Sequence, residues 1–306
     1  MPRFGDLLVP EEVTELIRGA IDVHVHVNPH IFQQNHAEDA LQLAAEAKEA
    51  GMRAVVLKDV GIPTTGTAYV VNRVTGFPVY GSYVMNLANG GINPRGVLVA
   101  LTHGDGAKIV YFPTGDTLNH YRYRQRYYKG INLPLTEEQA ITVLRDGKLI
   151  PEAREVIALI KEHGACLATA HLSSEETHAV VKEARNQGVE RIIISHAAWA
   201  MRQLSIEDLR EFARHGCALE FEFCLLTPLM YFVHGEPPAD PRKIVETVQA
   251  IGAEHCFISS DLGQLYCPKP VEGLRTYVAI LLKCGLSAKE IEFMLKRNPA
   301  RLMGLE

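Results

Sequence analysis

A short unit recurs along this chain and constrains its fold more than any other feature. A helical pattern ends at a glycine, an apolar strand follows within about four residues, and the strand ends at a polar residue. The four clearest copies begin at Gly51, Gly164, Gly188 and Gly252 and end at Lys58, His171, His196 and Asp261. Two pairs with capping-box spacing, Ser173 with Glu176 and Ser287 with Glu290, add helix starts. The sequence therefore alternates strands and helices over most of its length.

Counting the copies, together with weaker ones, predicts eight strands. They cover residues 21–27, 54–58, 79–85, 108–112, 166–171, 191–196, 218–223 and 256–261. Eight such units in about 250 residues fit an α/β fold of the (β/α)8 TIM barrel type. A doubly wound open sheet is the alternative, but its G-x-G-x-x-G and P-loop sequences do not occur at the strand-to-helix junctions. We therefore expect one barrel domain over residues 1–306, with residues 115–150 as a lid and hairpin insertion after the fourth strand.

Two histidines stand two residues apart in the first predicted strand. Side chains two apart on a strand point to the same side, so His24 and His26 present two imidazoles to one point, as a metal ion requires. The pair alone is weak evidence, because 13 histidines in 306 residues give an H-x-H about 0.5 times by chance. Its significance depends on whether other ligands lie beside it.

The strand ends supply such ligands. In a parallel barrel every strand ends at the same face, and catalytic residues gather there. This geometry predicts one group of metal-binding candidates at the mouth of the barrel: His24, His26, Lys58, His171, His196 and Asp261. A chance pair of histidines would rarely be joined by two further histidines and an aspartate at three separate strand ends.

The same pattern resembles the amidohydrolase superfamily over nearly the whole chain. In that superfamily the metal ligands are H-x-H on the first strand, a histidine on the fifth, another on the sixth and an aspartate on the eighth. The segment N-P-A-R-L-M-G-L at residues 298–305 also resembles the N-P-A-x-x-L-G-L that closes many of these chains. There we expect Asn298 as the cap of a helix that begins at Pro299. The resemblance implies a metal-dependent hydrolase from a poorly characterised branch.

The chain departs from the superfamily at the fourth strand. Many two-metal members carry a carboxylated lysine or a glutamate there, where this chain has Phe112, Pro113 and Thr114. Lys58, after the second strand, is a candidate substitute, because a desolvated lysine beside cations loses its proton more readily and can react with carbon dioxide. Lys58 is otherwise a cation that holds a substrate carboxylate, or a structural partner of Glu220 or Glu222. The number of metal ions, one or two, depends on which interpretation holds.

The ligand set predicts a mechanism. A divalent ion held by imidazoles and a carboxylate lowers the pKa of bound water toward about 7 and polarises the bond under attack. Asp261 is the expected general base and proton carrier. We expect zinc first, with manganese, iron or nickel as alternatives, since imidazole and carboxylate suit several ions.

Three functions remain open on these grounds. The first is hydrolysis of an amide, ester, lactone or related bond in a small anionic substrate. The second is a one-metal decarboxylase or lyase of a carboxylated unsaturated or aromatic acid, and the third is a metal-binding protein without catalysis. The substrate-binding residues are not identified by the sequence.

Composition limits the partners. A net charge of −5 and a pI near 6.2 argue against nucleic-acid and anionic-membrane partners. The N-terminal residues lack a signal-peptide pattern and no apolar run is long enough for a membrane span, so we interpret the chain as cytoplasmic. The six cysteines lack C-x-x-C spacing and are expected to be free, mostly buried thiols, so that nitrogen and oxygen atoms would hold any metal. A small-molecule substrate and a homo-oligomer complete these expectations.

Two further segments are expected near the mouth of the barrel. Residues 121–129 interleave tyrosines with arginines, which fits a lid that brings a cation or a phenol to an anionic substrate, or a subunit contact. Residues 141–150 are typical of a small hairpin that covers the same face. His30 and His36 follow the first strand and could line the mouth.

Overall fold

Eight parallel strands form the centre of the protein. The computed structural model describes residues 10–30, 36–127 and 135–306. The strands are β1 (Ile21–Val25), β2 (Ala54–Leu57), β3 (Val79–Val84), β4 (Ala107–Tyr111), β7 (Cys166–Ala168), β8 (Ile192–Ile194), β9 (Ala218–Glu222) and β10 (Cys256–Ser259). Each pairs with the next in chain order, β1-β2-β3-β4-β7-β8-β9-β10, and every pairing is parallel.

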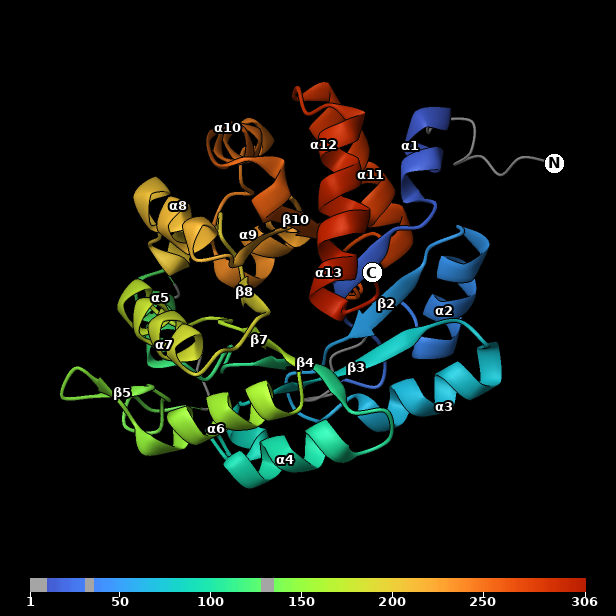
Figure 1. Ribbon diagram of the computed structural model, residues 1–306. Helices are drawn as coiled ribbons and strands as arrows, with labels where there is room; N and C mark the ends of the chain where they lie inside the picture. Colours follow the sequence, from blue (N-terminus) through green and yellow to red (C-terminus); the bar gives the residue numbers. More distant parts are fainter. Residues whose placement is uncertain (1–9, 31–35, 128–134) are drawn as a thin grey trace.

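The last strand meets the first, which closes the sheet into a barrel. The amide of Asp261 donates to the carbonyl of His24 (2.9 Å), and the amide of His26 donates to the carbonyl of Leu262 (2.8 Å). Figure 1 shows the resulting contact between the two ends of the chain, with the blue N-terminal elements beside the red C-terminal helices. The predicted (β/α)8 barrel is confirmed, including the position of all eight strands.

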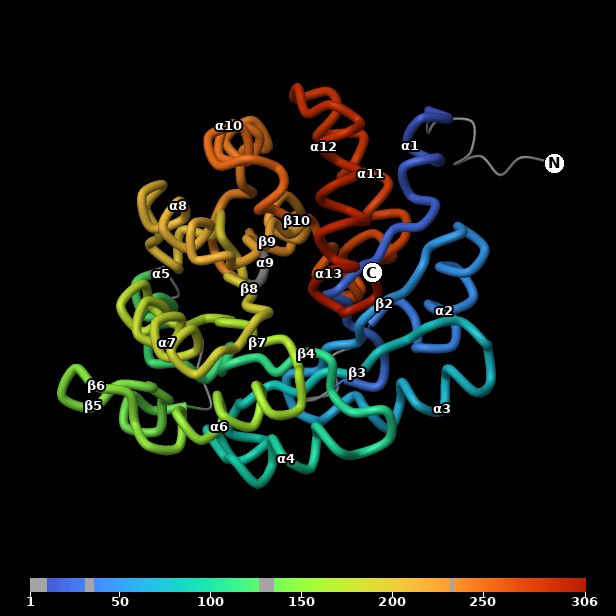
Figure 2. Tube along the Cα trace, in the orientation of Figure 1, coloured from blue at the N-terminus to red at the C-terminus, as the bar shows by residue number. Residues whose placement is uncertain are grey.

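Helices surround the strands, and the tube in Figure 2 follows the alternation of strand and helix around the barrel. The helices between or after the barrel strands are α2 (Ala40–Glu49), α3 (Thr65–Thr75), α4 (Pro94–Thr102), α6 (Pro151–Glu162), α7 (Ser174–Asn186), α8 (Ile206–Arg214), α10 (Pro241–Ile251) and α11 (Pro270–Lys283). The other helices are α1 (Glu11–Ile17), α5 (Leu118–Tyr127), α9 (Leu229–His234), α12 (Ala288–Glu292) and α13 (Asn298–Met303). The strands are buried on both faces, as parallel strands under a layer of helices must be.

Local sequence signals fix several of these boundaries. Ser173 and Ser287 begin α7 and α12, and each exchanges the two hydrogen bonds of a capping box with the glutamate three residues later. Gly188 follows α7 with a φ of 83°, a left-handed conformation that lets the chain turn into β8. Both predicted capping boxes are therefore confirmed.

The C-terminal segment differs from its prediction. Asn298 was expected to cap a helix, but residues Phe293–Arg297 form a π-helix that runs directly into α13. The Asn298 side chain is buried and donates hydrogen bonds to the carbonyls of Ala253 (2.8 Å) and Cys256 (2.6 Å). The asparagine thus anchors the start of β10 instead of capping a helix, because the preceding backbone is already helical.

The described residues of the insertion after β4 form a helix and a hairpin. The helix is α5, and the hairpin joins β5 (Leu144–Arg145) to β6 (Lys148–Leu149) in antiparallel register. Residues 128–134, including the end of the tyrosine- and arginine-rich segment, lie outside the described residues. No helix in the described part of the chain combines the length and apolar character that crossing a membrane requires.

The cysteines are free thiols, as predicted. Cys267 and Cys284 are partly exposed, and the other four are buried: Cys166, Cys217, Cys224 and Cys256. Cys224 is of further interest, because it lies at the mouth of the barrel beside Asp261.

Candidate metal centre

The six predicted ligands lie together at the carboxyl ends of the barrel strands. His24 is within β1, and the others follow β1, β2, β7, β8 and β10 by at most three residues. The predicted strands were too long at these points, because the chain leaves the sheet before the polar residue. His24 is fully buried. The other five line one cavity of about 1140 Å³: His26, Lys58, His171, His196 and Asp261.

Two imidazoles converge on one carboxylate oxygen. Oδ1 of Asp261 lies 2.9 Å from Nε2 of His24 and 3.0 Å from Nε2 of His26. The second oxygen, Oδ2, accepts a hydrogen bond from Sγ of Cys224 (3.0 Å). We refer to His24, His26, Lys58 and Asp261 as the first cluster. Its two imidazole nitrogens and its carboxylate are the donor types that hold catalytic zinc.

Lys58 reaches the same point from β2. Its Nζ lies 2.8 Å from Nε2 of His24 and 4.6 Å from the centre of the Tyr111 ring. The side chain is buried, and burial lowers the pKa of Lys58 even though Asp261 and two glutamates oppose the shift. Among the described residues, neither Glu220 nor Glu222 lies within ion-pair distance of Nζ, so the structural interpretation of this lysine has no contact to support it.

The two glutamates instead lie against histidines of the site. Oε1 of Glu220 lies 2.9 Å from Nδ1 of His24, and Oε1 of Glu222 lies 2.7 Å from Nδ1 of His196. The carboxylate of Glu220, bound to Nδ1 of His24, fixes the tautomer of that ring and directs its Nε2 toward a metal. Oε1 of Glu222 accepts a hydrogen bond from the backbone amide of His196 (2.7 Å) and none from its ring. The sequence predicts these glutamates only as partners of Lys58. Their position two apart in the apolar strand β9 indicates that both side chains point to the same face, which could have predicted their burial together.

The remaining predicted histidines form a second cluster, which we define as His120, His171 and His196. Nε2 of His171 lies 3.2 Å from Nε2 of His196, and Nδ1 of His171 lies 2.7 Å from Nδ1 of His120. His120 comes from α5 and was not predicted, because it lies on a helix of the insertion and follows no strand. The two facing Nε2 atoms are placed for a shared ligand.

A buried arginine holds the backbone of this second cluster. Arg202 is fully buried, and its Nε donates to the carbonyl of Leu172 (2.8 Å). Its Nη1 donates to the carbonyls of Ala170 and Ser195, which directly precede His171 and His196. Nη2 donates to the hydroxyls of Thr177 (2.8 Å) and Thr169 (3.3 Å). One guanidinium therefore fixes both segments that carry the cluster.

The electrostatics of the first cluster favour a bound cation. Burial opposes protonation of His24, but the charges of Asp261 and Glu220 raise its pKa to about 9. Burial would also raise the pKa of Asp261, yet the charge and hydrogen bond of His24 hold it well below its usual range. Positive charge is thus favoured where a buried imidazole faces this carboxylate. The donor set and this electrostatic environment both fit a divalent metal ion.

The histidines around this point are in the form that binds metals. Burial lowers the pKa of His26 to about 4 and that of His196 to about 3, so both imidazoles are neutral near pH 7. Nδ1 of His26 is buried and has no hydrogen-bond partner within the described residues. Such an orphaned atom in a cluster of ligands is a further indication that an additional group binds here.

The described lining of the rest of the cavity includes a cationic side chain and several apolar ones. Arg124, on α5, is partly buried, and its Nε has no hydrogen-bond partner within the described part of the chain. Trp199 lies across the cavity and packs edge-on against His171 and His196, with ring centres 5.2 and 5.5 Å apart. Leu225, with other apolar side chains, completes the wall.

Comparison with known protein sequences gives one match. A family described as a family of unknown function, DUF6282, matches residues 19–220. The comparison with curated proteins gives no match.

Comparison with solved structures gives many similar barrels. An amidohydrolase from Pseudomonas aeruginosa is 13% identical with a TM-score of 0.62, covering 95% of this chain and 98% of that one. The organophosphorus hydrolase from Deinococcus radiodurans is 18% identical with a TM-score of 0.59, covering 95% and 94%. A TatD homolog from Escherichia coli is 14% identical with a TM-score of 0.54, covering 94% and 98%. At these identities the similarity establishes the fold and confirms its resemblance to amidohydrolase-type barrels.

Proposed function

Because the chain belongs to DUF6282, a family of unknown function, its activity has to be inferred from its own site, and we propose that it is a metal-dependent hydrolase. Its substrate is a small anionic molecule with an amide, ester, lactone or related bond. The observation that carries this proposal is the convergence of His24, His26 and Asp261, with distances of 2.9 and 3.0 Å to one carboxylate oxygen.

The first cluster would hold one divalent ion, with zinc as the first expectation. His171 and His196 would hold a second, since their Nε2 atoms face each other at 3.2 Å. Glu220 would keep the ligand nitrogen of His24 directed into the site, and Glu222 would hold the backbone of His196 through its amide. A divalent ion at this place supplies Lewis acidity, which lowers the pKa of water and polarises the bond under attack.

Asp261 would carry the proton. Its low pKa keeps it an acceptor, and 14% of its side chain is exposed to the cavity. It would accept a proton from the attacking water and deliver it to the leaving group. Cys224 and His26 hold both carboxylate oxygens in place, so that the same atoms can take and return the proton without rearrangement.

We propose that Lys58 is carboxylated in the active protein. An ammonium group 2.8 Å from Nε2 of His24 would compete with a metal ion for that nitrogen. The lowered pKa of Lys58 favours the neutral amine, whose nitrogen can attack carbon dioxide; a nitrogen–carbon bond forms and one proton is released. The carbamate product carries a negatively charged oxygen that can bind a metal ion. It would replace the carboxylate ligand that the fourth strand lacks, because Thr114 stands there.

Arg124 supports the choice of an anionic substrate. Arg124 lies in the cavity wall on α5, and its Nε has no hydrogen-bond partner within the described residues. A carboxylate or phosphate accepts hydrogen bonds from such a planar donor with good geometry. The apolar wall that includes Trp199 would contact the uncharged part of the substrate.

Metal analysis tests this proposal. Protein purified without chelators is expected to contain at least one equivalent of metal, and the His24→Ala variant is expected to lose the equivalent that the first cluster holds. The matched control is His215→Ala, because His215 lies at the surface at the end of α8. Folded protein with less than half an equivalent of metal, unchanged by His24→Ala, would refute the proposal.

The state of Lys58 separates hydrolysis from the alternative function. A carbamate signal from labelled carbon dioxide that disappears in Lys58→Met supports the hydrolase. One metal ion with an unmodified Lys58, and release of carbon dioxide from a carboxylated acid, would instead establish the decarboxylase or lyase.

A further inference from the structure

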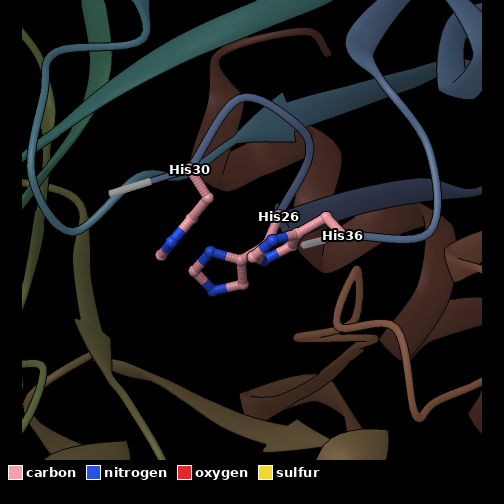
Figure 3. Close-up of side chains that lie close together, drawn as sticks. All are labelled: His26, His30 and His36. Carbon is pink, nitrogen blue, oxygen red and sulfur yellow. The ribbon is translucent and has the colours of Figure 1, made fainter. Parts of the chain in front are cut away.

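Three histidines gather beside the first cluster, and two of them have no part in the proposed hydrolytic site. Figure 3 shows the side chains of His26, His30 and His36 close together. One ring nitrogen from each lies within 4.8 Å of the others. The ring centres are 4.3 Å apart for His30 and His36, 5.6 Å for His26 and His30, and 6.1 Å for His26 and His36. We refer to these three residues as the loop cluster.

The backbone at His36 is held by hydrogen bonds on two sides. The side chain of Asn28 donates to the carbonyl of His36 (2.7 Å) and accepts from its amide (2.9 Å). His36 also pairs with Gln264, and the amide of Ala37 donates to the carbonyl of Gly263 (2.7 Å). His36 is thus fixed to both the first-strand segment and the segment after β10. Such preorganisation is what a metal site requires of its ligands.

His26 links the loop cluster to the first cluster. Its Nε2 lies 3.0 Å from Asp261, whereas its Nδ1 is buried without a hydrogen-bond partner in the described residues. The His26 ring can therefore contact the carboxylate through Nε2 and still offer Nδ1 to a second ligand-binding site. The side chain is only 6% exposed, so bulk water does not readily satisfy that nitrogen.

We propose that His26, His30 and His36 form an additional binding site for a divalent transition-metal ion. Three neutral imidazoles are a known ligand set for catalytic zinc, which leaves a fourth position open. All three residues line the large cavity, so the open position would be accessible to a substrate or to water. Imidazole ligands select zinc, copper, nickel or iron over calcium and magnesium. This site goes beyond the proposed hydrolytic centre and does not depend on it.

A bound ion in the loop cluster would change the charge of the cavity. Lys58 and Arg124 are the cationic side chains that line it among the described residues. A divalent ion in the loop cluster would add positive charge to the part of the cavity wall that His26, His30 and His36 form. The site would therefore strengthen the binding of an anionic substrate that spans the cavity.

Titration of the metal-free full-length protein with Co²⁺ alone tests the proposal, because cobalt reports both stoichiometry and ligand geometry by its visible absorption. The double variant His30→Ala/His36→Ala is expected to bind one equivalent fewer than the wild type and to lose one set of absorption bands. His215→Ala, the surface control, is expected to match the wild type. Circular dichroism checks that each variant is folded. The single variant His30→Gln changes only the partly exposed histidine of the loop cluster, so it tests Co²⁺ binding with less disturbance of the structure.

The His24→Ala variant separates this proposal from the proposed function. His24 is outside the loop cluster, so this variant is expected to keep the equivalent that the double variant loses. That result would support the loop cluster even if no hydrolysis were found. If folded His30→Gln and the double variant bind as much Co²⁺ as the wild type, with unchanged absorption, the loop cluster is not a metal site. Absence of any Co²⁺ binding to the wild type would overturn both proposals.

Discussion

Replacing Arg202 with methionine is expected to destabilise the protein and to disturb the second cluster more than the first. Methionine has a similar length and fills much of the same volume, but it donates no hydrogen bond. The substitution therefore removes the five hydrogen bonds of the guanidinium while leaving little empty space.

The magnitude follows from the groups left without a partner. Three main-chain carbonyls, of Ala170, Leu172 and Ser195, lose a charged donor in a fully buried position. Each unpaired buried acceptor costs about 1–3 kcal/mol, and removing the buried charge relieves part of the cost of its desolvation. Taking the carbonyls near the lower limit, we expect the free energy of unfolding to fall by about 3–5 kcal/mol.

Urea denaturation followed by circular dichroism measures this change. Arg214→Met on the exposed end of α8 is the matched control, with an expected change of about 0.5 kcal/mol or less. Arg202→Lys keeps the charge but loses the planar array of donors, so its stability should lie between those of the wild type and Arg202→Met.

Metal binding separates the local effect from the general one. The carbonyls next to His171 and His196 are bound by Arg202, whereas His24 and His26 are not. Folded Arg202→Met is therefore expected to lose metal from the second cluster first. An unfolding free energy within about 0.5 kcal/mol of the wild type would refute the reasoning, because the five hydrogen bonds would then contribute almost nothing.

Three further substitutions test other parts of the site. Glu220→Gln should weaken zinc binding about 10–100-fold, because His24 loses the carboxylate that orients it. Competition with a chromophoric chelator measures the affinity, and Glu152→Gln, at an exposed glutamate, is the control. Gly263→Ala should lower the free energy of unfolding by about 1–3 kcal/mol, because an added Cβ would lie 2.0 Å from the carbonyl oxygen of His26. Gly76→Ala, which has a positive φ but open space, shows the cost of backbone strain alone in the same thermal or urea unfolding experiment. Arg124→Gln should raise KM for an anionic substrate about tenfold or more, since a charged hydrogen bond contributes about 1.5–3 kcal/mol. Arg122 is an exposed arginine on the same helix, and an equal rise in KM for Arg122→Gln would contradict a specific role of Arg124.

Much of the fold was predictable because its signals are local. A glycine after each helix, an apolar run and a polar residue at its end are all within about ten residues of one another. Strand positions followed from these signals, and the parallel arrangement then placed His24, His171 and Asp261 at one face. Strand ends were less predictable, because the residues that leave the sheet are still apolar, as Ala170 is after β7.

The parts of the site that were missed depend on contacts between distant segments. His120 approaches His171 only because α5 folds back over the barrel mouth, and Arg202 meets its carbonyl partners across β7 and β8. Asn298 could be interpreted as a helix cap from its neighbours, yet its partners Ala253 and Cys256 are more than 40 residues away. A local pattern cannot predict such partners, since nothing near these residues in sequence identifies them.

The conformation of the ligand-bearing backbone depends on the closed barrel. Ala170, His196 and Asp261 have φ values of 48°, 55° and 49°, a region that costs non-glycine residues about 1–3 kcal/mol. In each case the amide is bound by another strand segment: Ala170 donates to Oγ of Ser195 (3.2 Å), His196 to Oε1 of Glu222 (2.7 Å), and Asp261 to the carbonyl of His24 (2.9 Å). These bonds run from one strand end to the next and finally from the last strand to the first. The strain that turns the ligands inward is therefore offset by contacts that exist only when the sheet is closed, so the geometry of the candidate metal centre is set by the barrel itself more than by its loops.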